Sequence, residues 1–328
     1  MTLDILVPQY KETEQVIKPL LDSIALQQLV NMQDISVIIV NDGSDVLLNE
    51  EFLQSYPFKV TYIKAEHKGV SATRQKALDL SKADYVMFCD ADDMFCHVCG
   101  LWIIFNEMKI GFDSLTSVFL EETKAPNEEH TFINRENDST FVHGKVHRRR
   151  YLLEQNIRWN PKLTIHEDSY FNILCRTCSP NPQGIKYCPT PFYLWRWRDE
   201  SVCRNDFKYI LKTYNNMLDS NTALIKEFQR RNKMNEACFY STSMIYDAYF
   251  TMNKDEWINQ ENKEYRDNTE RRFAEYYKEF SPLMSRVPIQ VQGQILQGLK
   301  NRFFGEGMFL EKITFDDWIK HVEETYLC

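Results

Sequence analysis

The sequence predicts an α/β protein in which a mostly parallel sheet, flanked by helices, is followed by an α-helical region. In the first hundred residues of the 328-residue chain, short apolar runs alternate with segments whose apolar residues recur at helical spacing. Such alternation implies parallel strands joined by right-handed crossovers. After Asn205 only helical patterns follow. We therefore expect two domains, residues 1–204 and 205–328.

The elements follow in order from these patterns. Apolar or alternating runs predict strands, and apolar residues three and four apart predict helices. Proline and glycine punctuate the carboxyl-terminal helices. We expect strands at 3–7, 35–40, 58–63, 85–89, 114–120 and 185–198, a loop at 124–129, and helices at 13–29, 69–82, 102–108 and 166–178, with short ones ending near 53 and 155. Further helices are expected at 207–231, 236–252, 257–280, 287–303 and 315–326.

Composition excludes several classes of protein. A hydrophobic content of 43% is typical of a globular chain. The net charge of −8 argues against a general binder of nucleic-acid backbones, although it is compatible with a local basic groove. No apolar run approaches the roughly 18–20 residues needed to cross a bilayer. Residues 3–8 are strand-like and lack the features of a signal peptide. We expect a cytoplasmic protein without a transmembrane segment.

Nine cysteines without an export signal are expected to be reduced thiols. Two pairs have CxxC spacing, Cys96 with Cys99 and Cys175 with Cys178. Together they could form a four-thiolate zinc site. Since each pair is expected on a helix and the pairs lie far apart in sequence, we favour small buried residues instead.

The central feature is the expected strand at 85–89, which ends in Asp90, Asp92 and Asp93. Open α/β sheets bind ligands at the carboxyl ends of their strands. Carboxylates this close together favour a divalent cation such as Mg²⁺ or Mn²⁺, and an Asp-x-Asp with a metal suits a nucleotide diphosphate. The alternative is an acidic turn that caps the next helix.

Other strand ends carry polar clusters as well. Residues 8–10 follow the first strand, and Asn41-Asp42-Gly43-Ser44 follows the second. A carboxylate such as Asp42 can accept hydrogen bonds from the N–H edge of a base, and Gly43 permits a close backbone approach. Arg74, near the start of the next helix, suits a nucleotide or a partner carboxylate. Helix capping and ordinary turns explain each motif taken alone.

Five motifs together resemble inverting family-2 glycosyltransferases with the GT-A fold, over roughly residues 1–200. They are Pro8-x-Tyr10-x-Glu12, Asn41-Asp42-Gly43-Ser44, Gly69-Val70-Ser71-Ala72-x-Arg74, Asp90-Ala91-Asp92-Asp93 and His166-Glu167-Asp168. Two positions depart from the family pattern: His67 stands where the family often has Asn, and Gln75 replaces the common Asn after Arg74.

This resemblance implies roles for the motif residues. Asp42 would bind the base, Asp90 the ribose or sugar, and Asp92 the metal, with Asp93 as a weaker ligand or sugar contact. Asp168 would be the general base that accepts the proton of the acceptor hydroxyl, supported by Glu167. The implied donor-binding set is Pro8, Tyr10, Glu12, Asp42, Arg74, Asp90 and Ala91.

Basic segments supply further candidates for diphosphate or acceptor contacts. Lys145 lies in an HGK segment that lines the acceptor cleft of similar enzymes, and Arg148 belongs to a triple arginine that otherwise indicates a solvated face. Arg196 and Arg198 belong to the aromatic segment 185–198, and either of them, with Ser201 and Arg204, would close over the diphosphate. The alternative is an amphipathic strand with outward-facing arginines. No histidine occurs between His166 and His321, so this segment is not expected to give the metal a histidine.

The sequence thus predicts a metal-dependent inverting glycosyltransferase that uses Mn²⁺ or Mg²⁺ and a nucleotide-diphosphate sugar, with UDP expected. The alternatives are a nucleotide-sugar-binding module without turnover and a nucleotidyltransferase. The latter normally has a glycine-rich phosphate loop after the first strand, and residues 9–13 contain no glycine. The sequence does not specify the sugar or the hydroxyl acceptor, which could be a glycan, a protein or a modified nucleic acid. It also does not specify the role of the helical region or whether the protein forms a homo-oligomer.

Overall fold

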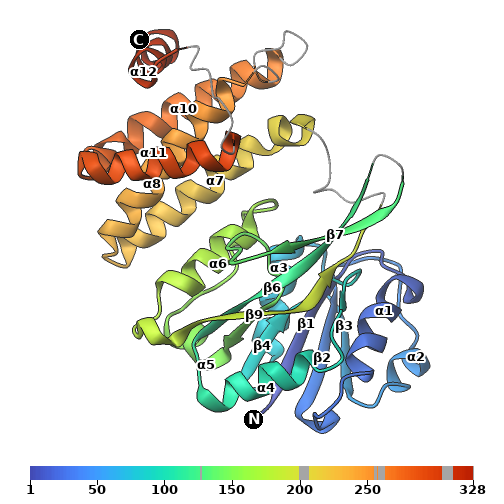
Figure 1. The fold of residues 1–328 in the computed structure, drawn as a ribbon. Coiled ribbons are helices and arrows are strands. Elements are labelled where there is room, and N and C mark those ends of the chain that lie inside the picture. The colour runs from blue at the N-terminus through green and yellow to red at the C-terminus, as the bar shows by residue number, and fades with distance from the viewer. Residues whose placement is uncertain (126–127, 199–206, 255–256, 258–262, 305–312, 328) are drawn as a thin grey trace. The chain divides into compact units, whose positions relative to one another are not determined.

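The computed structural model describes residues 1–125, 128–198, 207–254, 257, 263–304 and 313–327. Its contacts divide the chain into two compact units, Met1–Ser201 and Val202–Cys328 (Figure 1). The expected boundary at residues 204 and 205 lies outside the described residues.

The first unit is built on a nine-stranded mixed sheet with the order β3-β2-β1-β4-β8-β6-β9-β5, and β7 pairs with β6 (Figure 1). The strands β3, β2, β1 and β4 are parallel to one another. The strands are Leu3–Gln9 (β1), Ile35–Asn41 (β2), Lys59–Lys64 (β3), Tyr85–Phe88 (β4), Met94–Phe95 (β5), Ser114–Lys124 (β6), His130–Arg135 (β7), Lys145–Arg148 (β8) and Ile185–Trp195 (β9).

The predicted α/β class is confirmed. The strands beyond β4 extend the parallel part of the sheet into a mixed sheet. β8 runs antiparallel between β4 and β6, while β9 runs parallel to β6. Neither β7 nor β8 is evident in the sequence. Every side chain of β7 is exposed, so no buried face marks it. The buried residues of β8 include Lys145 and His147, whose polarity hides the strand.

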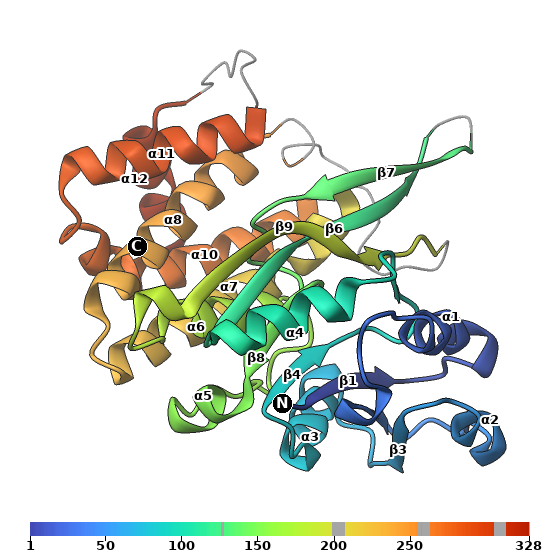
Figure 2. The same ribbon diagram turned by 60° about the horizontal axis from the view of Figure 1, so that its bottom comes forward.

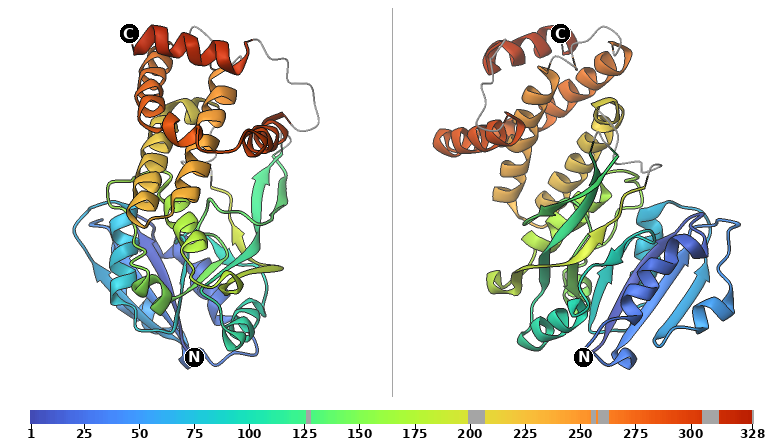
Figure 3. Two further views of the ribbon diagram at one scale, coloured as in Figure 1. Left: turned by 90° about the vertical axis from the view of Figure 1, so that its left-hand side faces the viewer. Right: turned by 45° about the vertical axis from the view of Figure 1, so that its right-hand side comes forward.

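Helices cover both faces of this sheet (Figures 2 and 3). Apolar residues of α1 and α4 join one core cluster with Leu3, Ile5 and Val7 of β1. The opposite face packs against α3, and Phe88 of β4 contacts Phe171 of α6 there. The helices are Glu14–Ala25 (α1), Glu50–Gln54 (α2), Val70–Leu80 (α3), Gly100–Ile110 (α4), Arg149–Glu154 (α5) and Glu167–Thr177 (α6), with 3₁₀ turns at Met32–Asp34 (η1) and Pro182–Gly184 (η2).

The second unit is helical, as predicted. Its central helix α8 contacts α7, α10 and α11, and α10 also contacts α12. Aromatic rings fill the interior: Trp318 stacks on Phe273 and lies 5.5 Å from the ring of Tyr249. No helix within the described ranges is long and apolar enough to cross a membrane. The helices are Phe207–Arg230 (α7), Met234–Met252 (α8), Lys263–Met284 (α10), Ile289–Phe304 (α11) and Phe315–Tyr326 (α12).

Candidate active site

The candidate site lies at the carboxyl ends of β1, β2 and β4. These strands are adjacent and parallel, so the residues that follow them meet at one edge of the sheet. The Asp42 N–H donates to the Gln9 carbonyl at 2.8 Å, and the Cys89 N–H donates to the Leu6 carbonyl at 3.0 Å. This register brings Tyr10, Asp42 and Asp90 to the same edge.

Asp42 is buried and organises the loop before α3. Its carboxylate accepts hydrogen bonds from the N–H groups of Lys68 and Gly69, at 2.8 and 3.0 Å. The ring nitrogen Nδ1 of His67 lies 2.9 Å from the same carboxylate. Gly43, at φ 74°, leaves room for this loop, because a Cβ there would lie 2.6 Å from the backbone nitrogen of His67. Asp42 therefore has a structural task in addition to any ligand.

An aromatic surface lies next to Asp42. The rings of Tyr10 and His67 stack with a centroid distance of 4.8 Å and an angle of 16°. Tyr10 is 41% exposed, and the His67 side chain is 59% exposed. Since a planar ring exposed at a strand end can stack on a planar ligand, this pair can accommodate a nucleobase.

Arg74 joins three carboxylates that are distant in the sequence. Its Nη2 donates to Asp90 at 2.7 Å, and its Nη1 donates to Glu167 at 3.0 Å and to Asp168 at 2.5 Å. Burial alone would raise the pKa of Asp90, but Arg74 and His143 hold it below its ordinary value. The three carboxylates thus surround one buried cation.

The start of α6 presents Glu167 and Asp168 to Arg74. His166 precedes them in the left-handed region, at φ 62°, which turns the chain sharply into the helix. Asp168 also accepts a hydrogen bond from the Val142 N–H at 3.2 Å. Burial and the neighbouring Asp168 raise the pKa of Glu167 to about 8, and burial raises the pKa of Asp168 against the opposing effect of Arg74. A pKa of about 8 keeps Glu167 mostly protonated at neutral pH.

The acidic turn after β4 is covered by residues that follow β9. Arg198 Nη1 donates to Asp92 Oδ2 at 2.9 Å and lies 3.9 Å from the Glu12 carboxylate. Arg196 donates from Nη1 to the Asp92 carbonyl at 3.2 Å. The structure therefore brings the predicted residues Glu12, Asp92, Arg196 and Arg198 together, whereas Ser201 and Arg204 lie outside the described residues.

Asp93 lies beneath this turn with a histidine that the sequence analysis missed. Asp93 accepts hydrogen bonds from the Tyr193 hydroxyl at 2.7 Å and the Arg196 N–H at 3.0 Å. His143 Nδ1 lies 3.4 Å from Asp93 Oδ2 and has no hydrogen-bond partner within the described part of the chain. His143 is also stacked against Phe141 and Tyr193, which keeps the ring buried. The sequence signal that could have identified His143 was its position in the HGK segment, directly before Gly144 and Lys145.

The donor set of this region suits a divalent cation. Among the described side chains, Asp90, Asp93 and His143 form the cluster of three potential ligands, with ligand atoms within 4.8 Å of one another. Asp92, the ligand expected from the sequence, is on the same turn but is not among these three residues, and its carboxylate pairs with Arg198. Oxygen ligands with one imidazole nitrogen match Mg²⁺ or Mn²⁺ better than a thiophilic metal. Of the two CxxC pairs, Cys96 and Cys99 precede α4 and are not on a helix as expected, whereas Cys175 belongs to α6 and Cys178 directly follows it.

The two other predicted basic residues, Lys145 and Arg148, each have an acidic partner, and Lys145 lies close enough to Asp168 for their charges to interact. Lys145 is 3% exposed; its ammonium donates to the Phe141 carbonyl and lies 3.5 Å from Asp138, and burial lowers its pKa. Arg148 pairs with Asp113 at 2.5 Å. In the sheet Arg148 lies opposite Tyr85, at the amino end of β4, whereas Asp90 follows the carboxyl end. The predicted contacts of Lys145 and Arg148 with the diphosphate or the acceptor stay predictions.

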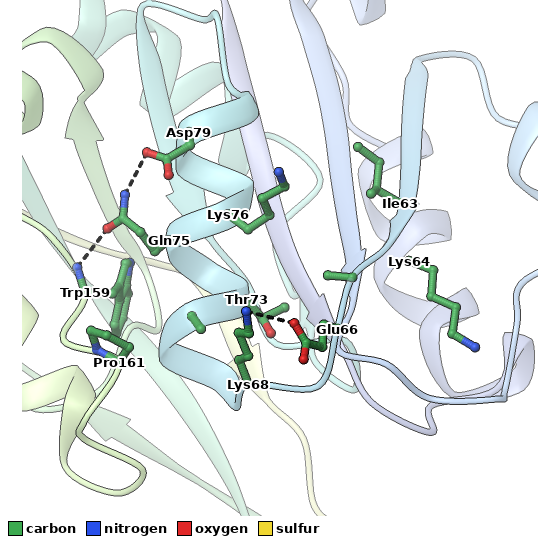
Figure 4. A pocket seen from close by; sticks show the side chains of 12 residues that line it. Ile63, Lys64, Glu66, Lys68, Thr73, Gln75, Lys76, Asp79, Trp159 and Pro161 are labelled. Atoms are coloured by element: carbon green, nitrogen blue, oxygen red, sulfur yellow. Dashed lines mark hydrogen bonds and ion pairs between the residues drawn. The ribbon is translucent and has the colours of Figure 1, made fainter.

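A pocket of about 520 Å³ lies along α3 (Figure 4). It is lined by side chains of α3 and of the preceding loop, and by Trp159 and Pro161. Lys68 on its rim is paired with Glu66 at 2.9 Å. The pocket shares Trp159 with the surroundings of Arg74, whose guanidinium lies over the Trp159 ring at 4.9 Å.

Comparison with known proteins identifies this part of the chain. Residues 4–96, which contain Asp42, Arg74 and the acidic turn, match the model of glycosyl transferase family 2. The chain carries a family 2 glycosyltransferase domain. A putative glycosyltransferase from Bacillus subtilis, EpsH, is 24% identical over 258 residues, which are 71% of each chain.

Solved structures agree on the fold of this glycosyltransferase. The crystal structure of S. aureus TarS 1-349 aligns with a TM-score of 0.62 and 15% identity, covering 100% of this chain and 91% of that one. Its complex with UDP-GlcNAc aligns with a TM-score of 0.60 and 15% identity, covering 100% and 92%. At this identity the likeness establishes the fold alone, and the predicted GT-A architecture with a helical carboxyl-terminal region is confirmed.

Proposed function

We propose that this glycosyltransferase moves a sugar from a UDP-sugar to an acceptor hydroxyl with inversion at the anomeric carbon. The observation that carries the proposal is the meeting of two groups of carboxylates at one sheet edge. Asp90, Asp92 and Asp93 follow β4, while Asp168 begins α6 and reaches the same buried guanidinium as Asp90. A transferase of this kind needs a leaving-group site and a base next to each other.

The donor would occupy the strand ends. Tyr10 and His67 offer an aromatic surface to a nucleobase, and Asp42 lies beside them. Pro8 and Glu12 border the same strand end, and Ala91 lies between the two acidic residues that would contact the sugar and the metal. UDP is proposed because TarS, which shares the fold, has been solved with UDP-GlcNAc.

A divalent cation, Mn²⁺ or Mg²⁺, would be held by Asp92 with help from its acidic neighbours, and would neutralise charge on the departing diphosphate. Arg198 and Arg196 lie over this turn and would contact the diphosphate oxygens. Both guanidinium groups are charged hydrogen-bond donors, so they would also orient the nucleotide-sugar. Lys145 and Arg148 have no part in this proposal.

Asp168 would act as the general base. The acceptor oxygen forms a bond to the anomeric carbon on the face opposite the diphosphate, the bond from that carbon to the phosphate oxygen breaks, and the acceptor proton passes to Asp168. Glu167, which is protonated at neutral pH, would support the ionised form of Asp168. The carboxyl-terminal helical domain would shape the acceptor site or mediate self-association.

The test is nucleotide release from a panel of UDP-sugars and other nucleotide-sugars with Mn²⁺ or Mg²⁺. The wild type is compared with Asp92→Ala and Asp168→Ala, and with Asp316→Ala as an exposed control on α12. We expect slow hydrolysis of one donor, lost in both site variants and kept in the control. If the wild type neither binds nor hydrolyses any donor with metal, the proposal is wrong.

A further inference from the structure

Arg74 contacts acidic residues from both parts of the proposed active site, the donor side and the side of the general base. It reaches Asp90 on the donor side with Nη2, and Glu167 and Asp168 on the base side with Nη1. The Arg74 side chain is only 4% exposed. Because a guanidinium is planar and rigid, the spacing of its two terminal nitrogens sets the spacing of the carboxylates that they bind.

Trp159 supports this guanidinium from one side. The Arg74 carbon Cζ lies 4.9 Å from the centroid of the Trp159 ring, a cation–π contact. The Trp159 ring is stacked on Phe171, with centroids 4.2 Å apart and an angle of 4°. Phe171 belongs to α6, the helix that begins with Glu167 and Asp168, and Phe88 at the end of β4 packs edge-on against both rings. The stack therefore connects the helix that carries the base to the strand that leads to Asp90.

Gln75 fixes the backbone of Trp159 in the same arrangement. Its Oε1 accepts a hydrogen bond from the Trp159 N–H at 3.0 Å, and its Nε2 donates to Asp79 at 2.9 Å, as Figure 4 shows. Arg74 and Gln75 are consecutive in α3. One helix thus holds both the guanidinium and the main chain of the aromatic residue beneath it.

We propose that Arg74, held in place by Trp159, is a positioning residue that keeps Asp168 in register with Asp90. The proposal rests on the proposed function, in which Asp168 is the base. Arg74 would act through these carboxylates and would not contact the nucleotide, since its terminal nitrogens are engaged by acidic side chains and the residue is buried. A lysine at this position would keep the charge, but its single ammonium group cannot hold both sides at their present spacing.

Four variants test this proposal. Arg74→Lys keeps the positive charge but removes the fork, that is, the two terminal guanidinium nitrogens that bind separate carboxylates. Trp159→Leu removes the aromatic face, and Trp159→Phe restores part of it. Arg158→Lys is the control, because Arg158 is next to Trp159 in sequence but exposed and paired with Asp79 at 3.4 Å. UDP affinity with Mn²⁺, and kcat and KM for hydrolysis of the donor found above, are measured for each.

We expect Arg74→Lys to lower kcat by about 100-fold, the size of effect that a displacement of about 1 Å produces in a catalytic group. UDP affinity should stay within about threefold of the wild type, because the nucleotide does not touch Arg74. Trp159→Leu should lower kcat about tenfold with unchanged UDP affinity, and Trp159→Phe should recover most of that loss. Arg158→Lys should match the wild type.

Three outcomes overturn the proposal. If Arg74→Lys weakens UDP binding and leaves kcat intact, Arg74 is a donor ligand; if it is as active as the wild type, the fork has no role. Should Arg74→Lys fail to fold, the pair at Trp159 decides: equal kcat for Trp159→Leu and Trp159→Phe contradicts the proposal. Full activity of Asp168→Ala would instead overturn the proposed function.

Discussion

Arg198 donates a hydrogen bond of 2.9 Å to Asp92, although 105 residues lie between them in the chain. Asp92 is the carboxylate proposed to hold the metal, so a cation of the protein and the metal ion share one partner. Glu12, 3.9 Å from the same guanidinium, completes this arrangement. If Asp92 holds the metal as proposed, Arg198 would give up part of its contact with Asp92 when the metal binds.

Replacing Arg198 should therefore strengthen metal binding in the absence of donor. Exposed ion pairs contribute about 0–1 kcal/mol, so we expect Arg198→Gln to bind Mn²⁺ up to about fivefold more tightly in calorimetric titration. Turnover should fall, because the diphosphate loses a charged contact. Arg135→Gln, which removes an ion pair with Glu121 elsewhere in the sheet, is the control. Weaker Mn²⁺ binding by Arg198→Gln would contradict the competition.

Asp168→Asn should abolish proton transfer while preserving shape. We expect kcat for hydrolysis to fall about 10²–10⁴-fold, the usual contribution of a general base, with UDP affinity unchanged. Asp316→Asn makes the same chemical change at an exposed position of α12 and should have no effect. An Asp168→Asn variant with kcat within about threefold of the wild type would remove Asp168 from the mechanism.

The rate of the wild type should also depend on pH in a defined direction. Burial raises the pKa of Asp168, and the base acts only when ionised. As pH is lowered, kcat should therefore begin to fall at a pH above the ordinary carboxyl range of about 4. A profile of kcat against pH that stays flat down to about pH 4 would show that this carboxyl does not limit the reaction.

Glu167 should make the folded protein less stable at higher pH. Its pKa is raised to about 8 in the fold from an ordinary value of 4.5, so the folded state binds a proton that the unfolded state has released. This contribution is fully present below the unfolded pKa and is lost as pH rises through the folded pKa. The free energy of unfolding of the first unit, from urea denaturation, should therefore fall between about pH 4.5 and 8. Glu167→Gln should flatten this dependence, and an unchanged slope would be the contrary result.

Two glycines should respond to alanine in opposite directions. Gly144 has φ 64°, and a Cβ there would collide with Ser117 Oγ, so Gly144→Ala should destabilise the first unit by about 1–3 kcal/mol. Gly293 lies on α11, where an added Cβ would meet no atom of the described residues within 4 Å, so Gly293→Ala should stabilise the second unit by about 0.5–1 kcal/mol. Urea denaturation measures both, and a stabilising Gly144→Ala would contradict the close contact.

Much of the fold follows from local patterns. The buried strands β1, β2 and β4 and the helix α3 are recognisable because apolar spacing and strand ends are local properties of the sequence. The strands β7 and β8 are not, since one exposes all its side chains and the other buries polar ones. Arg148 shows the same limit: its position at the amino end of β4 depends on antiparallel pairing with a strand about 60 residues earlier in the chain.

The sequence alone determined the α/β class, the run of helices after residue 205 and the placement of carboxylates at strand ends, because spacing and residue type specify these directly. Only the tertiary structure decided which carboxylates meet. Asp90 and Asp168 converge because Phe171 of α6 packs against Phe88 of β4 and because Arg74 bridges the two carboxylates. His143 likewise lies next to Asp93 only because segments distant in the sequence pack together. Contacts across such distances depend on how whole elements pair, which no local pattern records.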